Sequence, residues 1–248
     1  MNQTTTQPSL PPMQSSFSLL VNSLFFIKNN LRKISGIILI MLLPRIILDS
    51  TQLYLFYLLV KGSDISAIFT NIYFYGNPII YFFSLFISVL GSIALLIFIN
   101  NNAPLTSVGQ LYKKSLNLII PYLWIAILSA LITIGGLVLL IIPGLVWAIS
   151  YSLGIYILMA ENIGGYRALK RSRELVQGYW WPVFFKYLFL FALFIIAALP
   201  LLFVNILFAG HWSLIISFVF NLIYSFLLIA VSTVYSFNIY LDLRRIKG

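Results

Sequence analysis

Long apolar runs, separated by short polar segments, fill the chain from residue 34 to residue 241. A bilayer core about 30 Å thick requires roughly 20 apolar residues per helix, and these runs approach or exceed that length. The pattern therefore predicts an all-α polytopic membrane bundle of six transmembrane helices. We expect the spans at about 34–60, 78–100, 118–142, 144–161, 182–208 and 212–241.

The remaining segments bound the domain organisation. Residues 1–16 are rich in Gln, Thr, Pro and Ser and carry no basic residue, so we expect a disordered tail rather than a signal peptide. Residues 17–248 then form a single membrane domain. With 61% hydrophobic and 8% charged residues, the chain has too little polar surface to cover a soluble globule. It contains no cysteine, which excludes disulfides and thiolate chemistry.

The third and fourth spans are separated by very few residues. Pro143 cannot continue a helix, and Gly144 accepts the dihedral angles of a tight turn. The sequence therefore predicts a reversal at Pro143 and Gly144, and a close antiparallel hairpin around it.

The basic residues divide unequally between the two sides of the membrane in this six-span topology. Of the 15 lysines and arginines, only Lys61 falls on the outer side and only Arg45 lies deep inside a span. The positive-inside rule then predicts that both termini are cytoplasmic. Tryptophans favour membrane boundaries, so we expect Trp124, Trp180 and Trp181 at the inner boundary and Trp147 at the outer one.

A short amphipathic segment precedes each pair of spans on the cytoplasmic side, at about 15–32, 105–117 and 164–180. The second carries Lys113 and Lys114. The third places Tyr166, Leu169, Ser172, Val176 and Tyr179 on one helical face, and the other face carries Arg167, Lys170, Arg171, Arg173, Glu174 and Gln177. Such a helix can lie in the headgroup plane and face anionic lipid. Alternatively, its charge only sets the topology.

The three segments also allow two interpretations of the whole chain. They are either a threefold repeat of one surface helix and one hairpin, or the basic inner flank that any hairpin needs.

Polar groups inside the spans are candidate functional residues. Arg45 and Asp49 lie one helical turn apart just after Pro44, and each is costly in hydrocarbon, so we expect them to face the bundle and pair. The pair is either a structural ion pair or part of a polar pathway or lipid-phosphate site. Isolated amides in the last two spans predict interhelical hydrogen bonds from Asn205, Asn221 and Asn238. Close helix packing is expected at Gly135, Gly136 and Gly154.

Residues 136–181 resemble the glycerophosphoryl diester phosphodiesterase membrane-domain family and related bacterial inner-membrane proteins. The shared features are the Pro143–Gly144 hairpin, an acidic residue before a glycine (Glu161 and Gly164), the Ala168–Ser172 helix and the Gly178–Tyr179–Trp180 segment. The resemblance implies a multi-pass protein of the bacterial cytoplasmic membrane. In that family the catalytic half is a separate soluble barrel with His and acidic metal ligands. This chain has a single histidine, His211, so the enzymatic activity does not carry over.

The sequence therefore favours a non-enzymatic protein with no cofactor and no metal. The leading hypothesis is an accessory or scaffold module that contacts anionic inner-leaflet lipid, or an unidentified protein partner, and does not bind nucleic acid. The candidate contact residues are Arg167, Lys170, Arg171, Arg173, Lys113 and Lys114. The alternative is a small transporter or transporter subunit with a polar site at Arg45 and Asp49. An intramembrane hydrolase ranks third because paired carboxylates are missing.

Overall fold

Every secondary-structure element in the described part of the chain is an α-helix. The computed structural model describes residues 11–60, 77–101, 107–207 and 211–247. The helices are α1 (Ser16–Asn29), α2 (Leu31–Val60), α4 (Asn77–Asn101), α5 (Val108–Leu139), α6 (Ile141–Tyr151), α7 (Gly154–Glu161), α8 (Gly165–Val176), α9 (Trp180–Leu207) and α10 (His211–Lys247). The predicted fold class, a helical membrane bundle, is confirmed.

Five helical segments among the described residues are long and apolar enough to cross a membrane: Ile80–Asn101, Val108–Leu139, Ile141–Glu161, Trp180–Pro200 and Ile215–Lys247. They correspond to five of the six expected spans. The sixth, 34–60, falls on α2, a single helix of 30 residues. Most side chains in its second half, Asp49 among them, lie outside the described part, as does Lys61.

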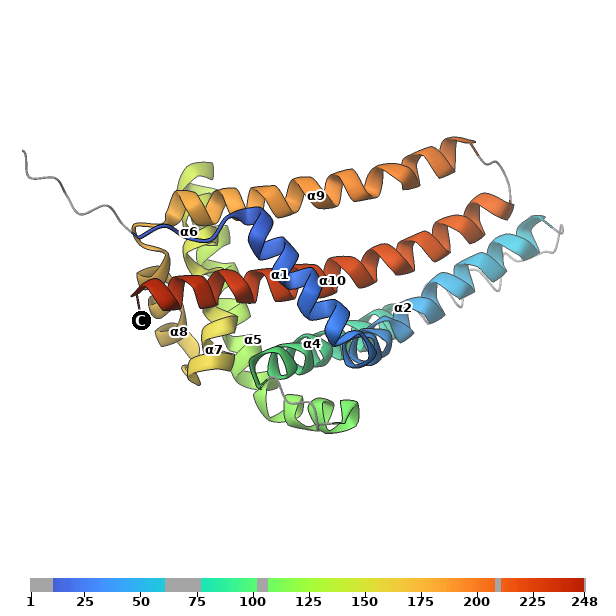
Figure 1. The fold of residues 1–248 in the computed structure, drawn as a ribbon. Coiled ribbons are helices and arrows are strands. Elements are labelled where there is room, and N and C mark those ends of the chain that lie inside the picture. Colours follow the sequence, from blue (N-terminus) through green and yellow to red (C-terminus); the bar gives the residue numbers. More distant parts are fainter. Residues whose placement is uncertain (1–10, 61–76, 102–106, 208–210, 248) are drawn as a thin grey trace, which may run out of the picture.

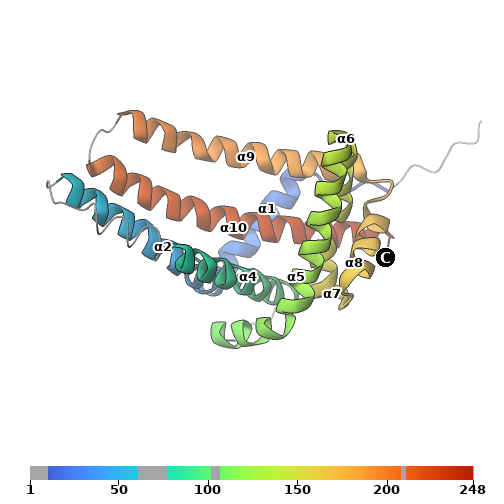
Figure 2. The ribbon, with the colours of Figure 1, turned by 180° about the vertical axis from the view of Figure 1, so that it is seen from behind.

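The axes of the long helices α2, α9 and α10 are roughly aligned, and α4 packs beside α2 (Figure 1). The apolar core draws side chains from every described helix, and its largest fully buried side chains include Ile37, Phe98, Tyr235 and Tyr240. The C-terminal end of α10 lies beside α8 in both views (Figures 1 and 2). We call this end of the molecule, formed by α8 and the C-terminal turns of α10, the basic end.

Helix α1 covers α10 on the outside of the bundle (Figure 1). Its inner face buries Leu19, Leu20 and Ile27, but its outer face exposes Phe17 and Phe25, which are 69% and 65% exposed. The predicted segment at 15–32 is thus helical from Ser16 to Asn29, and its exposed face carries Asn22 and Lys28 beside the apolar residues. Apolar residues on both faces suit a helix that packs on protein on one side and meets acyl chains on the other.

Helix α5 starts at a capping box, in which Ser107 and Gln110 bond to each other's backbone amides at 3.3 and 3.2 Å. Its N-terminal part, drawn in green, bends away from the rest (Figure 1). Pro121 lies inside the helix and lacks the amide that would bond the Asn117 carbonyl, which is the usual cause of such a kink. Within the predicted surface segment 105–117, residues 108–117 are thus the first part of a continuous bent helix, and residues 105 and 106 lie outside the described part.

The α5–α6 hairpin is as tight as predicted, but its turn is elsewhere. Leu140 alone connects the two helices, in an extended conformation with φ −160° and ψ 143°. Pro143 lies in the first turn of α6, where a missing amide costs nothing because it would have no helical partner. Gly144 is a packing residue rather than a turn residue: a Cβ on Gly136 would come within 2.8 Å of its Cα. The prediction for Gly136 is confirmed.

The hairpin runs across α9 and α10 rather than beside them (Figures 1 and 2). Its position is fixed near the start of α9, because Trp180 Nε1 donates to the Val146 carbonyl at 3.3 Å. The sequence placed Trp180 and Trp147 at opposite membrane boundaries. In the structure Trp180 bonds the carbonyl of Val146, the residue next to Trp147, so the two tryptophans lie near the same end of α9 and that expectation is wrong.

The side chains around the turn, from Val138 to Ile142, are each at least 67% exposed and all apolar. Because they cannot face water, we expect the turn to lie within hydrocarbon. The natural chain lacks cysteine, so single cysteines can test this. A Leu140→Cys protein should resist membrane-impermeant maleimide from both sides, whereas Tyr166→Cys, at an exposed position of α8, should react from one side. Labelling of the Leu140→Cys protein from the side opposite to the one that labels Tyr166→Cys would contradict the crosswise hairpin.

Candidate functional site

Helix α8 presents a basic face outward and an apolar face to the protein. Ala168, Leu169, Leu175 and Val176 are buried against α5, α6 and α7. The exposed side carries Arg167, Lys170 and Arg173, which we call the α8 basic face. The predicted amphipathic pattern is confirmed, with Tyr166 as an exception at 64% exposure. The apolar face, however, packs on neighbouring helices rather than entering the headgroup layer.

The fourth apolar segment is interrupted between α6 and α7. Ser172, which is fully buried on α8, bonds the backbone groups at this break. Residues 152 and 153 separate α6 from α7, and the Ile149 carbonyl already accepts from the amide and the hydroxyl of Ser152. Ser172 Oγ therefore accepts from the Leu153 amide at 3.2 Å and donates to the Ser150 carbonyl at 2.7 Å. Gly154, just beyond the break, lets Leu169 approach: a Cβ there would lie 2.9 Å from Leu169 Cδ2.

Glu161, the last residue of α7, connects α7 and α8 to α10. Its carboxylate accepts from the Tyr240 hydroxyl at 2.8 Å and lies 3.5 Å from Arg171 Nε and 4.0 Å from Arg244 Nε. The carboxylate is largely buried, at 13% exposure. Arg171 is therefore directed toward this internal cluster, and is not part of the α8 basic face.

The C-terminal turns of α10 extend the basic surface. Lys247 Nζ donates to the Glu174 carbonyl at 2.6 Å and also to the Gln177 carbonyl, so it caps the end of α8. Arg244 and Arg245 are exposed beside it on α10. Lys113 and Lys114 are exposed on the N-terminal part of α5, which lies apart from α8 in both views (Figures 1 and 2). The structure does not join them to this surface.

Arg45 lines a cavity of about 390 Å³ between α2, α4 and α10. Its Nη1 donates to Ser225 Oγ at 3.2 Å. The other polar groups at the cavity are Ser84, Ser88, Asn221 and Tyr224. Arg45 thus reaches α10, although its side chain is exposed rather than enclosed by the bundle, and hydroxyls on α4 and α10 accompany it. The Asp49 side chain lies outside the described part, so its pairing stays a prediction.

The three candidate asparagines behave differently. Asn238 Nδ2 donates to Ser23 Oγ on α1 at 3.0 Å, as predicted for an interhelical bond. Asn221 Nδ2 bonds within its own helix, to the Ser217 carbonyl at 2.9 Å, so the prediction of an interhelical bond is not met by this group. Asn205 has its side chain outside the described part.

Close helix packing was also expected at Gly135, but this glycine has open space around it rather than a packing partner.

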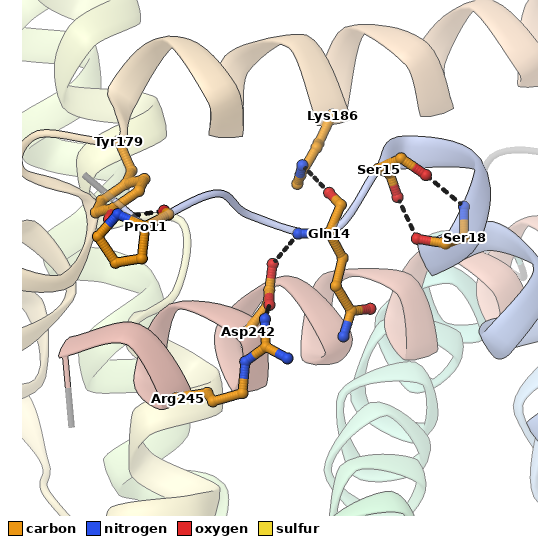
Figure 3. Close-up of polar contacts among 8 residues, drawn as sticks. All are labelled: Pro11, Gln14, Ser15, Ser18, Tyr179, Lys186, Asp242 and Arg245. Carbon is orange, nitrogen blue, oxygen red and sulfur yellow. Dashed lines mark hydrogen bonds and ion pairs between the residues drawn. The ribbon is translucent and has the colours of Figure 1, made fainter. Parts of the chain in front are cut away.

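Residues 11–16, predicted to belong to a disordered tail, lie along a groove between α9 and α10 (Figure 3). The Gln14 amide donates to Asp242 Oδ2 at 2.8 Å, and the Gln14 carbonyl accepts from Lys186 Nζ at 2.6 Å. Tyr179 OH donates to the Pro11 carbonyl at 3.1 Å. Asp242 also pairs with Arg245 at 2.7 Å. For residues 11–16 the prediction is wrong, because two buried charges bind their main chain; residues 1–10 lie outside the described part.

Sequence reasoning missed this cluster. In the sequence, Lys186 contributes only to the charge asymmetry between the two sides of the membrane, and no pattern singles out Asp242. The available signal was a cation that follows the start of an apolar run, since an ionisable group in such a place needs a partner.

The chain was compared with family models, with curated proteins and with solved structures, and none of these matches it. The resemblance to the phosphodiesterase membrane-domain family therefore stays a prediction. Among the described residues, no group of three His, Cys, Asp or Glu side chains is placed to hold a metal ion.

Removing the Ser172 hydroxyl should destabilise the protein. Ser172→Ala leaves the Leu153 amide and the Ser150 carbonyl buried without this partner, and we expect the free energy of unfolding to fall by about 1–3 kcal/mol. Ser115→Ala is the matched control: Ser115 is equally buried, but its hydroxyl bonds only the Leu111 carbonyl of its own helix. Chemical denaturation in detergent would compare the two. Equal losses would show that the bridge has no special role.

Proposed function

We propose that this integral membrane protein binds anionic lipid headgroups at the basic end and serves there as an accessory or scaffold module. The observation that carries the proposal is the placement of the α8 basic face beside Arg244, Arg245 and Lys247. Lys247 joins the two elements, so their cations form one surface on a rigid support. Glu161 and Asp242 already have cationic partners within the protein. Glu174 is the acid exposed on α8 itself, and the basic residues around it outnumber it. Guanidinium and ammonium groups suit phosphate oxygens.

We further propose that the basic end faces the cytoplasm of a bacterial cell, with both termini on that side. The support is the charge distribution of the sequence, since lysine and arginine are retained on the cytoplasmic side during insertion. The same orientation places the basic end against the leaflet that carries anionic lipid.

Neutralising the α8 basic face should weaken lipid binding. The triple variant Arg167→Gln, Lys170→Gln, Arg173→Gln removes three charges, each of which contributes about 1 kcal/mol near an anionic surface. We expect retention of phosphatidylglycerol to fall at least tenfold, measured by native mass spectrometry at low salt, with phosphatidylcholine retention unchanged.

The control for this experiment is Lys28→Gln, Lys113→Gln, Lys114→Gln, which removes the same charge from exposed positions on α1 and the first part of α5. It should retain phosphatidylglycerol nearly as well as the natural protein. Equal loss in both triple variants would mean that only net charge matters, and that the α8 basic face is not a lipid site.

The second candidate function is a small transporter or transporter subunit. It is favoured by one observation, the cavity where Arg45 meets hydroxyl and amide groups from α4 and α10. Cavities lined by polar groups at membrane depth are where solute sites occur.

Uptake by proteoliposomes would test this candidate with radiolabelled phosphate and acetate as small anions. If the cavity is a transport site, Arg45→Gln should abolish uptake, and Ser225→Ala, which removes a bond to the guanidinium, should reduce it severalfold. Ser232→Ala should have no effect, because Ser232 lies on the same helix but does not line the cavity. Uptake that ignores Arg45 would argue against transport at this place.

A further inference from the structure

The groove between α9 and α10 recognises the main chain of the segment that lies in it. The polar contacts that Tyr179, Lys186 and Asp242 make to the segment all go to backbone groups, the carbonyl of Pro11 and the amide and carbonyl of Gln14 (Figure 3). The Lys186 ammonium on α9 thus binds the carbonyl of Gln14, and the Asp242 carboxylate on α10 binds its amide. Side chains at these positions of the segment make none of these contacts, so the groove can accept different sequences.

With the segment in place, the two charged groups are buried. Lys186 is 5% exposed and Asp242 is 3% exposed. Buried charges are retained only where they have partners, and the chain supplies the Lys186 ammonium with a peptide carbonyl. Charge-assisted bonds of this kind are about twice as strong as bonds between neutral groups.

The segment suits the groove because it is already extended. Pro11 and Pro12 each fix φ, so little conformational entropy is lost when the segment lies down. Tyr179, Pro182 and Phe185 line the groove beside it, as aromatic and proline side chains do in domains that bind proline-rich peptides. A space of about 430 Å³ remains between the segment and these walls. Residues 11–16 therefore do not fill the groove and are not tightly packed against its walls.

We propose that this groove is a binding site for an extended, proline-containing peptide segment, and that residues 11–16 occupy it in cis as a detachable latch. The ligand class follows from the contacts: a segment in which one residue presents both an amide and a carbonyl to Asp242 and Lys186. The site is distinct from the α8 basic face but adjoins the C-terminal turns of α10, because Asp242 pairs with Arg245 and Lys247 Nζ lies 5.7 Å from the centre of the Tyr179 ring.

A peptide supplied in trans tests the proposal. The protein is a variant that lacks residues 1–15, in detergent, and the probe is a fluorescent peptide of residues 9–16. We expect the peptide to bind the shortened protein and not the full chain, where the tethered segment competes at a high effective concentration. A shortened protein that remains folded and monodisperse but does not bind the peptide overturns the proposal.

Two peptide variants separate main-chain recognition from general stickiness. Gln14→Pro removes the amide that donates to Asp242, and Gln14→Ala keeps it. The proline peptide should bind roughly tenfold or more weakly than the alanine peptide, because one charge-assisted bond is lost. Equal affinities would contradict the proposed recognition.

A second measurement uses the full chain and holds even if the shortened protein does not fold. Met13→Cys places a thiol at a half-buried position of the segment. Its maleimide labelling should be severalfold faster with Gln14→Pro than with Gln14→Ala, and excess natural peptide should speed it further by occupying the groove. Equal labelling rates, or no response to the peptide, would show a fixed strap and overturn the proposal.

Discussion

Backbone groups that leave a helix within or beside hydrocarbon need a partner inside the protein, because lipid offers none. This constraint explains the basic end of the molecule. Two irregular stretches beside α8 are bonded by side chains from other helices: Ser172 bonds the backbone between α6 and α7, and Lys247 bonds the C-terminal end of α8. The helices are therefore joined where they are interrupted, and not only where their apolar faces meet.

The same constraint separates charges that hold the fold from charges that are available to ligands. Arg171 and Lys186 act inward, on the Glu161 carboxylate and the Gln14 carbonyl. Arg167, Lys170 and Arg173 lie on the opposite side of α8 and face outward. On α8 itself, only this outward group can attract a lipid phosphate, so the number of basic residues on the helix overstates its lipid-binding surface.

Periodicity and length were enough to predict the helices, the fold class and the two faces of α8, since these follow from local sequence. They could not predict which residues meet across helices. The turn was expected at Pro143 and Gly144, yet Leu140 makes it, because proline is equally acceptable in the first turn of a helix and glycine is needed for close packing. Residues 11–16 look disordered by composition, and only the fold brings Lys186 and Asp242 to them. The Arg45 cavity was partly foreseen, since an arginine in an apolar run was expected to face the bundle.

The crosswise hairpin also shows what charge asymmetry can and cannot determine. A hairpin returns to the side from which it starts, whether it crosses the whole membrane or only enters it, so the distribution of lysine and arginine is the same in both cases. Helix lengths carry the missing information. Helix α10 has 37 residues, or about 55 Å, against a hydrocarbon core of about 30 Å. Such a helix must either tilt strongly or extend beyond the core, and its charged last turns suit the second solution at the basic end. The α5–α6 hairpin packs across the first turns of α9, so its length does not have to match that of α10.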